Sequence, residues 1–131
     1  MLERNIMNPA LFNTVPKNDY LDYNSSISAL KKVSEFLDLS KNDISKATGQ
    51  KKESIRYDAR MPHELKTRLE EIGNIINLTA SFFEGDLNKT AIWFKTPNPL
   101  LGDVSPRDMI RYGRYEKLRK FILNAIDGNN P

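Results

Sequence analysis

The stretch from Trp93 to Arg114, WFKTPNPLLGDVSPRDMIRYGR, constrains the fold more than any other part of the chain. Two X-Pro pairs and a glycine stand between two apolar runs, and a helix-start signal and a Gly-Arg pair follow. Proline and glycine are the strongest local breakers of regular structure, so this order predicts a specific turn rather than a generic linker. We expect the turn to reverse the chain and pack Trp93 on the final helix, and also to present side chains to a partner.

Four positions define this turn. Thr96 and Asn98 each precede a proline, which favours an extended backbone at both. The Asn98 side chain can hydrogen-bond the local backbone, and Gly102 permits a left-handed residue. The sequence SPRD from Ser105 predicts a helix with a serine N-cap and proline at its first position. A rigid turn of this kind loses little entropy when it docks.

The rest of the chain predicts an all-α fold, because helical periodicity recurs and no alternating strand pattern is found. We expect a helix from Ser26 to Asp38 and a second one with a capping box at Ser40 and Asp43, closed by Gly49. Further helices are expected over about 51–58, 62–83, 88–94, 105–113 and 114–126. The buried face of the last one comprises Leu118, Phe121, Ile122 and Ala125.

The sequence divides into three parts: an N-terminal arm at 1–26, partly disordered, a helical bundle at 27–84 and a small helical domain at 85–128. Leu11, Phe12, Tyr20 and Tyr23 could dock the arm onto a surface. The absence of cysteine fits a reducing compartment. No apolar run approaches the length of a membrane span, and the N-terminus lacks a secretion signal. We therefore expect a cytoplasmic protein that does not enter a membrane.

Basic side chains are concentrated in two regions of a chain whose net charge is only +3. Residues 41–60 hold six basic and three acidic side chains, and residues 105–120 hold six basic and two acidic ones. The stretch between them, 61–104, is net acidic. Two basic islands suggest two anionic partners, and the alternative is that each island is a solvated helix face.

The first island has the layout of a helix-turn-helix, LSKNDISKATGQKKESIRYDAR. Its second helix would enter the major groove of DNA and face outward with basic and hydroxyl side chains. The predicted DNA contacts are Lys51, Lys52, Ser54, Arg56, Tyr57 and Arg60. Short helices joined by a glycine turn are also common packing units, so DNA binding and simple packing both remain open here.

An enzyme is not expected. The one histidine, His63, follows Pro62 at a helix start and has no acid or nucleophile placed to work with it. No metal-ligand spacing, phosphate-binding glycine loop or nucleophile elbow occurs. We therefore expect no cofactor and no metal.

The segment from about Thr90 to Asp127 resembles the toxin-binding domain of the Xre/MbcA/ParS antitoxin family. That family's pattern is a short helix ending in Trp-Leu or similar, then T-P-N-P-x-L-G-G-x-[ST]-P, a short helix, a glycine and a last helix. This chain has WFKTPNPLLGDVSP, then RDMIRYG, then RYEKLRKFILNAI. It departs at Asp103, where the family usually has a second glycine. Residues 27–84 resemble the Xre-type helix-turn-helix that precedes this domain.

The resemblance implies an antitoxin of a type II toxin–antitoxin pair. Its partner would be a RES-domain toxin, similar to ADP-ribosyltransferases and acting on NAD, whose active site the C-terminal domain would cover. The helix-turn-helix would bind operator DNA and repress the operon, as a homodimer or a larger complex with the toxin. The expected toxin contacts are Trp93, Asn98, Leu100, Arg107, Arg111, Tyr112, Arg114 and Tyr115.

Two alternatives remain at this point. The chain could be a stand-alone helix-turn-helix transcriptional regulator whose C-terminal part serves only for dimerisation. It could also be an interaction module that has lost DNA binding, with the 41–60 island as a solvated face.

Overall fold

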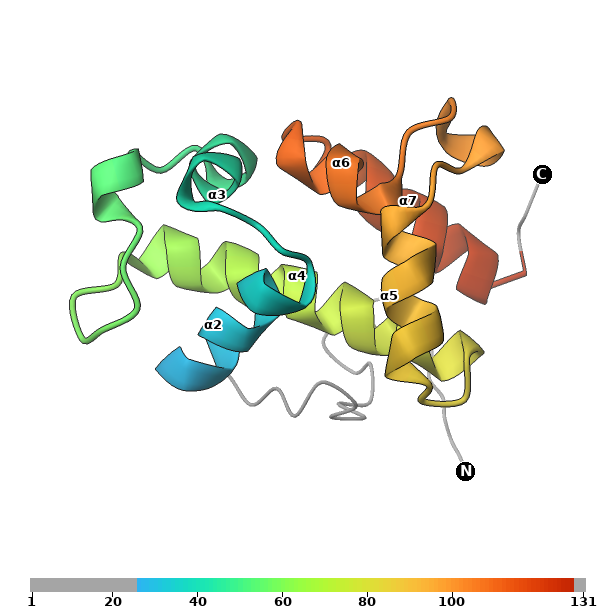
Figure 1. Ribbon diagram of the computed structural model, residues 1–131, viewed down its shortest axis with the longest axis horizontal. Helices are drawn as coiled ribbons and strands as arrows, with labels where there is room; N and C mark the ends of the chain where they lie inside the picture. The colour runs from blue at the N-terminus through green and yellow to red at the C-terminus, as the bar shows by residue number, and fades with distance from the viewer. Residues whose placement is uncertain (1–25, 129–131) are drawn as a thin grey trace.

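The computed structural model describes residues 26–128, and every regular element in that range is helical (Figure 1). Six α-helices and two short 3-10 helices follow one another: α2 (Ile27–Phe36), α3 (Lys41–Thr48), η1 (Lys52–Ser54), α4 (His63–Phe82), α5 (Leu87–Lys95), η2 (Pro99–Leu101), α6 (Pro106–Arg111) and α7 (Tyr115–Ile126). The all-α prediction is confirmed. The predicted N-terminal arm, except for Ser26, lies outside the described residues.

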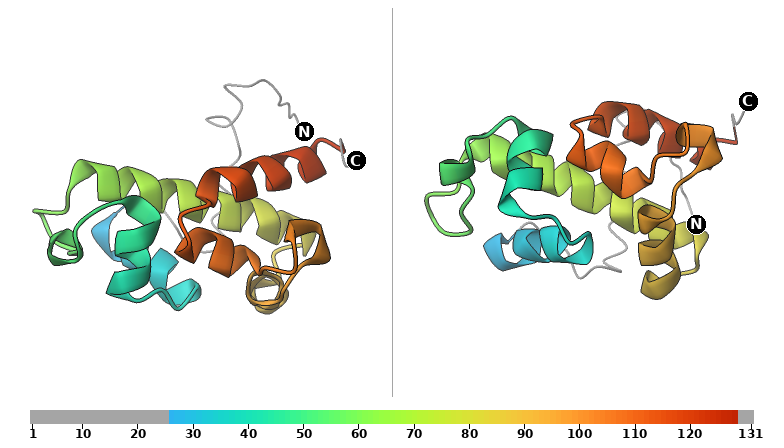
Figure 2. Two further views of the ribbon diagram at one scale, coloured as in Figure 1. Left: turned by 90° about the horizontal axis from the view of Figure 1, so that it is seen from above. Right: turned by 45° about the horizontal axis from the view of Figure 1, so that its top comes forward.

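The long helix α4 is the central element. It crosses the molecule, with α2, α3 and η1 toward one end and α5, α6 and α7 toward the other, and Figure 2 shows the same division in two further views. In the first half of α4 only the residues on one face of the helix are buried, whereas every residue from Ile75 to Ala80 is buried. A helix buried all round lies inside the core. Gly73 is tolerated mid-helix because packing rather than propensity holds α4.

One hydrophobic core joins the two regions that the sequence divides at residue 84. Buried side chains of α2 and α3, such as Leu30 and Ile44, belong to the same cluster as Phe94, Ile110 and Leu118. Helix α3 also packs directly on α6. The two regions therefore share their apolar interior. No helix within residues 26–128 is long and apolar enough to span a bilayer.

The predicted helix ends are confirmed where the signal is local. Ser40 Oγ accepts a hydrogen bond from the Asp43 N–H at 3.1 Å, and the Asp43 carboxylate accepts one from the Ser40 N–H at 3.0 Å. Gly49 closes α3 with a φ of 77°. At the start of α6, Ser105 Oγ accepts from the Asp108 N–H at 3.0 Å. Each cap needs only residues within one turn, so it can be read from the sequence.

The predicted helix from Lys51 to Asp58 is wrong. Only the 3-10 helix η1 forms there; Ile55 is extended, and residues 55–57 have no regular structure. Ile55 is buried, Tyr57 packs on the same core, and the Tyr57 hydroxyl donates to Ser34 Oγ at 3.1 Å. Residues i and i+2 share a side in an extended chain but lie about 200° apart in a helix. A helix over this segment would point the two side chains to opposite sides, so it could not pack both on the same core. The second helix of the predicted helix-turn-helix is missing from this segment.

Candidate protein-binding site

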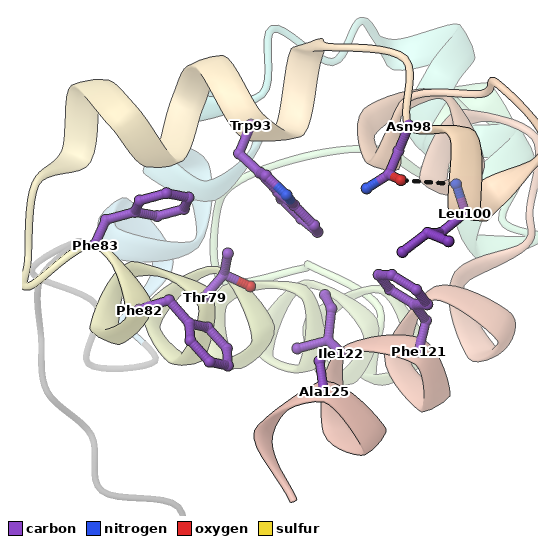
Figure 3. A pocket seen from close by; sticks show the side chains of 9 residues that line it. All are labelled: Thr79, Phe82, Phe83, Trp93, Asn98, Leu100, Phe121, Ile122 and Ala125. Atoms are coloured by element: carbon purple, nitrogen blue, oxygen red, sulfur yellow. Dashed lines mark hydrogen bonds between the residues drawn. The ribbon is translucent and has the colours of Figure 1, made fainter. Parts of the chain in front are cut away.

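An apolar cavity of about 240 Å³ opens between α5, the end of α4, the loop around η2 and α7 (Figure 3). Three of the predicted toxin contacts, Trp93, Asn98 and Leu100, line it. The full lining is Thr79, Phe82, Phe83, Trp93, Asn98, Leu100, Phe121, Ile122 and Ala125. The apolar side chains at the rim of the cavity are unusually exposed to solvent: Phe82 is 52% and Leu100 72% exposed. Exposed apolar side chains gathered around a hollow are typical of an interaction site.

Asn98 holds the loop that forms one wall of the cavity. Its N–H donates to the Val104 carbonyl at 3.2 Å, and its own carbonyl accepts from the N–H groups of Leu101 and Asp103 at 2.9 and 3.0 Å. Its side-chain Oδ1 accepts from the Leu100 N–H at 2.9 Å. Four hydrogen bonds thus converge on one residue, so the loop has a defined shape before any partner arrives.

The backbone conformation of the loop agrees with the sequence pattern. Thr96 and Asn98 are extended, as expected before proline, and Gly102 is left-handed with a φ of 73°. Asp103 is also left-handed, with a φ of 65°. Aspartate tolerates this conformation better than most residues, which lets it stand where the resembled family usually has glycine.

Trp93 is fixed from behind by its neighbour. The rings of Trp93 and Phe94 meet edge to face, with centroids 5.1 Å apart and planes at 87°. Phe94 is completely buried, whereas Trp93 is half-buried and reaches into the cavity from α5 (Figure 3). The indole is therefore anchored in the core on one side and accessible on the other.

Arg107 does not line the cavity. It donates from Nε to the Leu37 carbonyl and from Nη2 to the Asp38 carbonyl at 2.6 Å. Those carbonyls end α2 and have no partner within a helix. Lys95 adds an ion pair to the Asp38 carboxylate, Nζ to Oδ2 at 2.7 Å, which lowers the pKa of Asp38. Arg107 thus fastens α6 to the chain just after α2.

Arg111 has a similar internal role. Its Nη1 lies 2.8 Å from Asp108 Oδ1 and its Nε lies 2.9 Å from Asp43 Oδ1, and these two hydrogen bonds raise its pKa. Partial burial opposes ionisation of Asp43, but hydrogen bonds from the Ser40 N–H and from Arg111 outweigh it and lower the pKa of Asp43. Arg111 therefore joins α6 to the start of α3.

The other predicted toxin contacts lie outside the cavity and differ in how far they are exposed. Tyr112 is 49% exposed and, with Arg111, borders a separate polar depression of about 370 Å³ beside α3. Arg114 is exposed at the start of α7. Tyr115 is only 2% exposed, with the Arg68 guanidinium 4.7 Å from its ring centroid. The ring is part of the core, so the structure does not place Tyr115 at the surface that an aromatic anchor requires.

The predicted DNA contacts also fall into two groups. The four cations Lys51, Lys52, Arg56 and Arg60 are exposed, whereas Ser54 and Tyr57 are half-buried. Arg56 forms an ion pair with Asp58, Nη2 to Oδ2 at 2.7 Å. Tyr57 is turned inward, and its burial raises its pKa although the hydrogen bond to Ser34 opposes this. The positive charge of the segment is accessible, but its geometry is not that of a recognition helix.

Most of the remaining cavity residues lie on helix faces that the sequence predicts to be buried in the core. Phe121 and Ala125 are part of the predicted buried face of α7, yet both are only half-buried and line the cavity. Phe82 is the last residue of α4 and Phe83 is its C-cap, so both lie at the end of its apolar face. The ends of α4 and α7 carry more large apolar residues than one buried face of a helix requires, and this excess is the sequence signal for the cavity. That these residues meet around one cavity is seen only in the tertiary structure.

The described residues contain no cluster of three or more His, Cys, Asp or Glu side chains that could hold a metal. His63 is exposed at the start of α4, and its Nε2 lies 3.5 Å from Thr67 Oγ1. Comparison of the chain with known protein families, with curated proteins and with solved structures finds no significant match. Its function is therefore inferred from its own residues.

Proposed function

We propose that this protein is the antitoxin of a type II toxin–antitoxin pair. Residues 85–128 bind the cognate toxin, of the RES-domain class that acts on NAD, and neutralise it by covering its active site. The observation that carries this proposal is the cavity at Trp93, Asn98 and Leu100, because it lies in the segment whose sequence resembles the toxin-binding domain of Xre/MbcA/ParS antitoxins.

The physical properties of this surface suit a protein partner. The loop is held by hydrogen bonds at Asn98 and the indole is anchored by Phe94, so little conformational entropy is lost on docking. Aromatic side chains around a hollow are typical of the centre of a protein interface. The proposed role is binding rather than catalysis, in the cytoplasm, with no cofactor.

Repression of the operon through DNA binding is the second part of the proposal. Exposed Lys51, Lys52 and Arg60 support it, because they can neutralise phosphates. The absence of a helix over residues 55–58 favours contacts with the DNA backbone over reading of bases by a helix. The proposed functional form is a homodimer or a larger complex with the toxin. The alternative, a stand-alone regulator that dimerises through its C-terminal part, predicts DNA binding without any toxin partner.

Co-expression tests the main proposal. The reading frame next to this gene is expressed alone and together with the full chain, and growth and copurification are measured. We expect arrest of growth by the neighbour alone, rescue by this protein, and a stable complex of the two. The absence of both rescue and a complex would refute toxin neutralisation. Salt-dependent binding to the upstream DNA, compared between the native chain and a Lys51→Glu, Lys52→Glu variant, tests the DNA role separately.

A further inference from the structure

We infer that the cavity takes one large apolar side chain of the partner protein, carried on a non-helical segment whose backbone carbonyl oxygens accept hydrogen bonds from Asn98 and Trp93. This inference rests on the proposed function, since it specifies the chemistry by which the same site recognises its partner.

The first donor is the side-chain amide of Asn98. Its orientation is fixed, because the end that accepts from the Leu100 N–H at 2.9 Å must be the oxygen. The Nδ2 group is therefore the opposite end, and Figure 3 shows it pointing into the cavity. Among residues 26–128 it has no hydrogen-bond acceptor. A donor held in place and left without a partner is ready to bind a ligand oxygen.

The second donor is the indole N–H of Trp93, which likewise has no acceptor in the described part of the chain. The remaining polar side chain of the lining is Thr79, whose hydroxyl already donates to the Ile75 carbonyl at 2.7 Å. The Asn98 oxygen is occupied by the loop. The apolar cavity therefore offers two donors, and its best complement is an apolar group with acceptors beside it.

The volume of the cavity limits which chemical groups can occupy it. Its volume of about 240 Å³ is below the range of about 300–1,000 Å³ usual for small-molecule sites, and suits a single large side chain. No charged side chain lines it, which favours neutral acceptors over a carboxylate. Carbonyl oxygens inside a helix are already bonded, so those that reach Asn98 and Trp93 must come from a loop or a strand edge.

A pair of small probes tests this chemistry without the partner. N-acetyl-L-phenylalaninamide carries an aromatic side chain between two carbonyls, and toluene has the ring alone. Trp93 is the only tryptophan, so the ¹⁵N-labelled full chain gives one indole N–H signal. We expect the amide to bind with a dissociation constant in the low-millimolar range and to shift the Trp93 indole and Asn98 side-chain N–H signals to lower field. Toluene, which controls for ring currents, should not produce this shift.

A near-isosteric variant removes one donor and keeps the loop. Asn98→Asp retains an oxygen for the Leu100 N–H but replaces the NH₂ group. We expect the affinity for the amide probe to fall about tenfold, with an unchanged fold by circular dichroism. Ile92→Ala, on the exposed side of α5 outside the cavity, is the matched control and should bind normally.

The outcomes separate this inference from the proposed function. Absence of any shift at Trp93 and Asn98 with tens of millimolar amide, or equal affinity of Asn98→Asp and the native chain, would overturn the inference. Toxin rescue in co-expression would stand in either case. Conversely, binding of the amide as expected together with a failed rescue would support the cavity chemistry and refute the antitoxin.

Discussion

Arg111 of α6 and Asp43 of α3 lie 68 residues apart in the sequence, yet Arg111 Nε is 2.9 Å from Asp43 Oδ1. Asp43 also completes the capping box at the start of α3. One carboxylate therefore closes a local helix end and ties the C-terminal region to the N-terminal one. The two predicted domains are connected by charge as well as by a shared core.

Asp43→Ala is expected to lower the free energy of unfolding by about 1 to 2 kcal/mol, because it removes a helix cap and the partner of Arg111. The measurement is urea denaturation at neutral pH. Asp58→Ala is the matched control, since its ion pair with Arg56 is local and exposed. It should change stability little. Equal losses for both variants would contradict a bridging role for Asp43.

The contribution of Asp43 to folding stability should decrease at acidic pH. Its folded pKa is lowered, so the stabilisation is present above the unfolded value of about 3.9 and is lost as pH falls through the folded pKa. We expect the stability difference between the native chain and Asp43→Asn to be constant near neutral pH and to shrink below about pH 4. A stability difference that grows on acidification would contradict the lowered pKa of Asp43 in the folded state.

Leu100→Asp is expected to weaken binding of the cognate toxin by more than about tenfold while leaving stability unchanged, because Leu100 is 72% exposed at the cavity rim. Ile92→Asp is the matched control. Ile92 is 64% exposed but does not line the cavity. Affinity measured by calorimetry should separate the two variants. Equal weakening would mean that the toxin surface is not centred on the cavity and includes the exposed side of α5.

Gly102→Ala should destabilise the protein by about 1 kcal/mol, since φ is 73° and an alanine there is strained although no atom lies in its way. Gly128→Ala is the control, with a φ of 74° and equally open surroundings, but beyond the last helix. No described helix follows Gly128, so the effect of Gly128→Ala on stability should be smaller. Thermal unfolding of both variants gives the comparison, and a neutral Gly102→Ala would mean that the loop readjusts.

Tyr115→Phe is expected to leave stability unchanged or to raise it by up to about 1 kcal/mol. The Tyr115 hydroxyl is buried and has no hydrogen-bond partner among the described residues, so its removal relieves a desolvation cost. Tyr115→Ala should cost about 3 to 5 kcal/mol through the cavity it leaves. Chemical denaturation measures both. If Tyr115→Phe lowered toxin affinity at constant stability, the hydroxyl would have to reach the partner after all.

Local chemistry explains which predictions are confirmed. The serine cap at Ser105, the capping box at Ser40 and the left-handed Gly102 each depend on neighbours within a few residues. The segment 51–58 is different, because its shape is set by Ile55 and Tyr57 packing on a core made by distant helices. Local propensity favours neither form strongly there, so tertiary contacts decide.

The all-α class, most helix ends, the extended backbone at Thr96 and Asn98 and the left-handed Gly102 could thus be predicted from the sequence, whereas the 3-10 helix η2 between them could not. Packing between distant helices sets what each side chain contacts. It turned Arg107 and Arg111 inward to carbonyls and carboxylates of α2 and α3, buried Tyr115, and exposed Phe121 to the cavity beside Trp93. The physical reason is that a cap is a contact between near neighbours, whereas a cavity or an interhelical ion pair exists only after distant segments have packed.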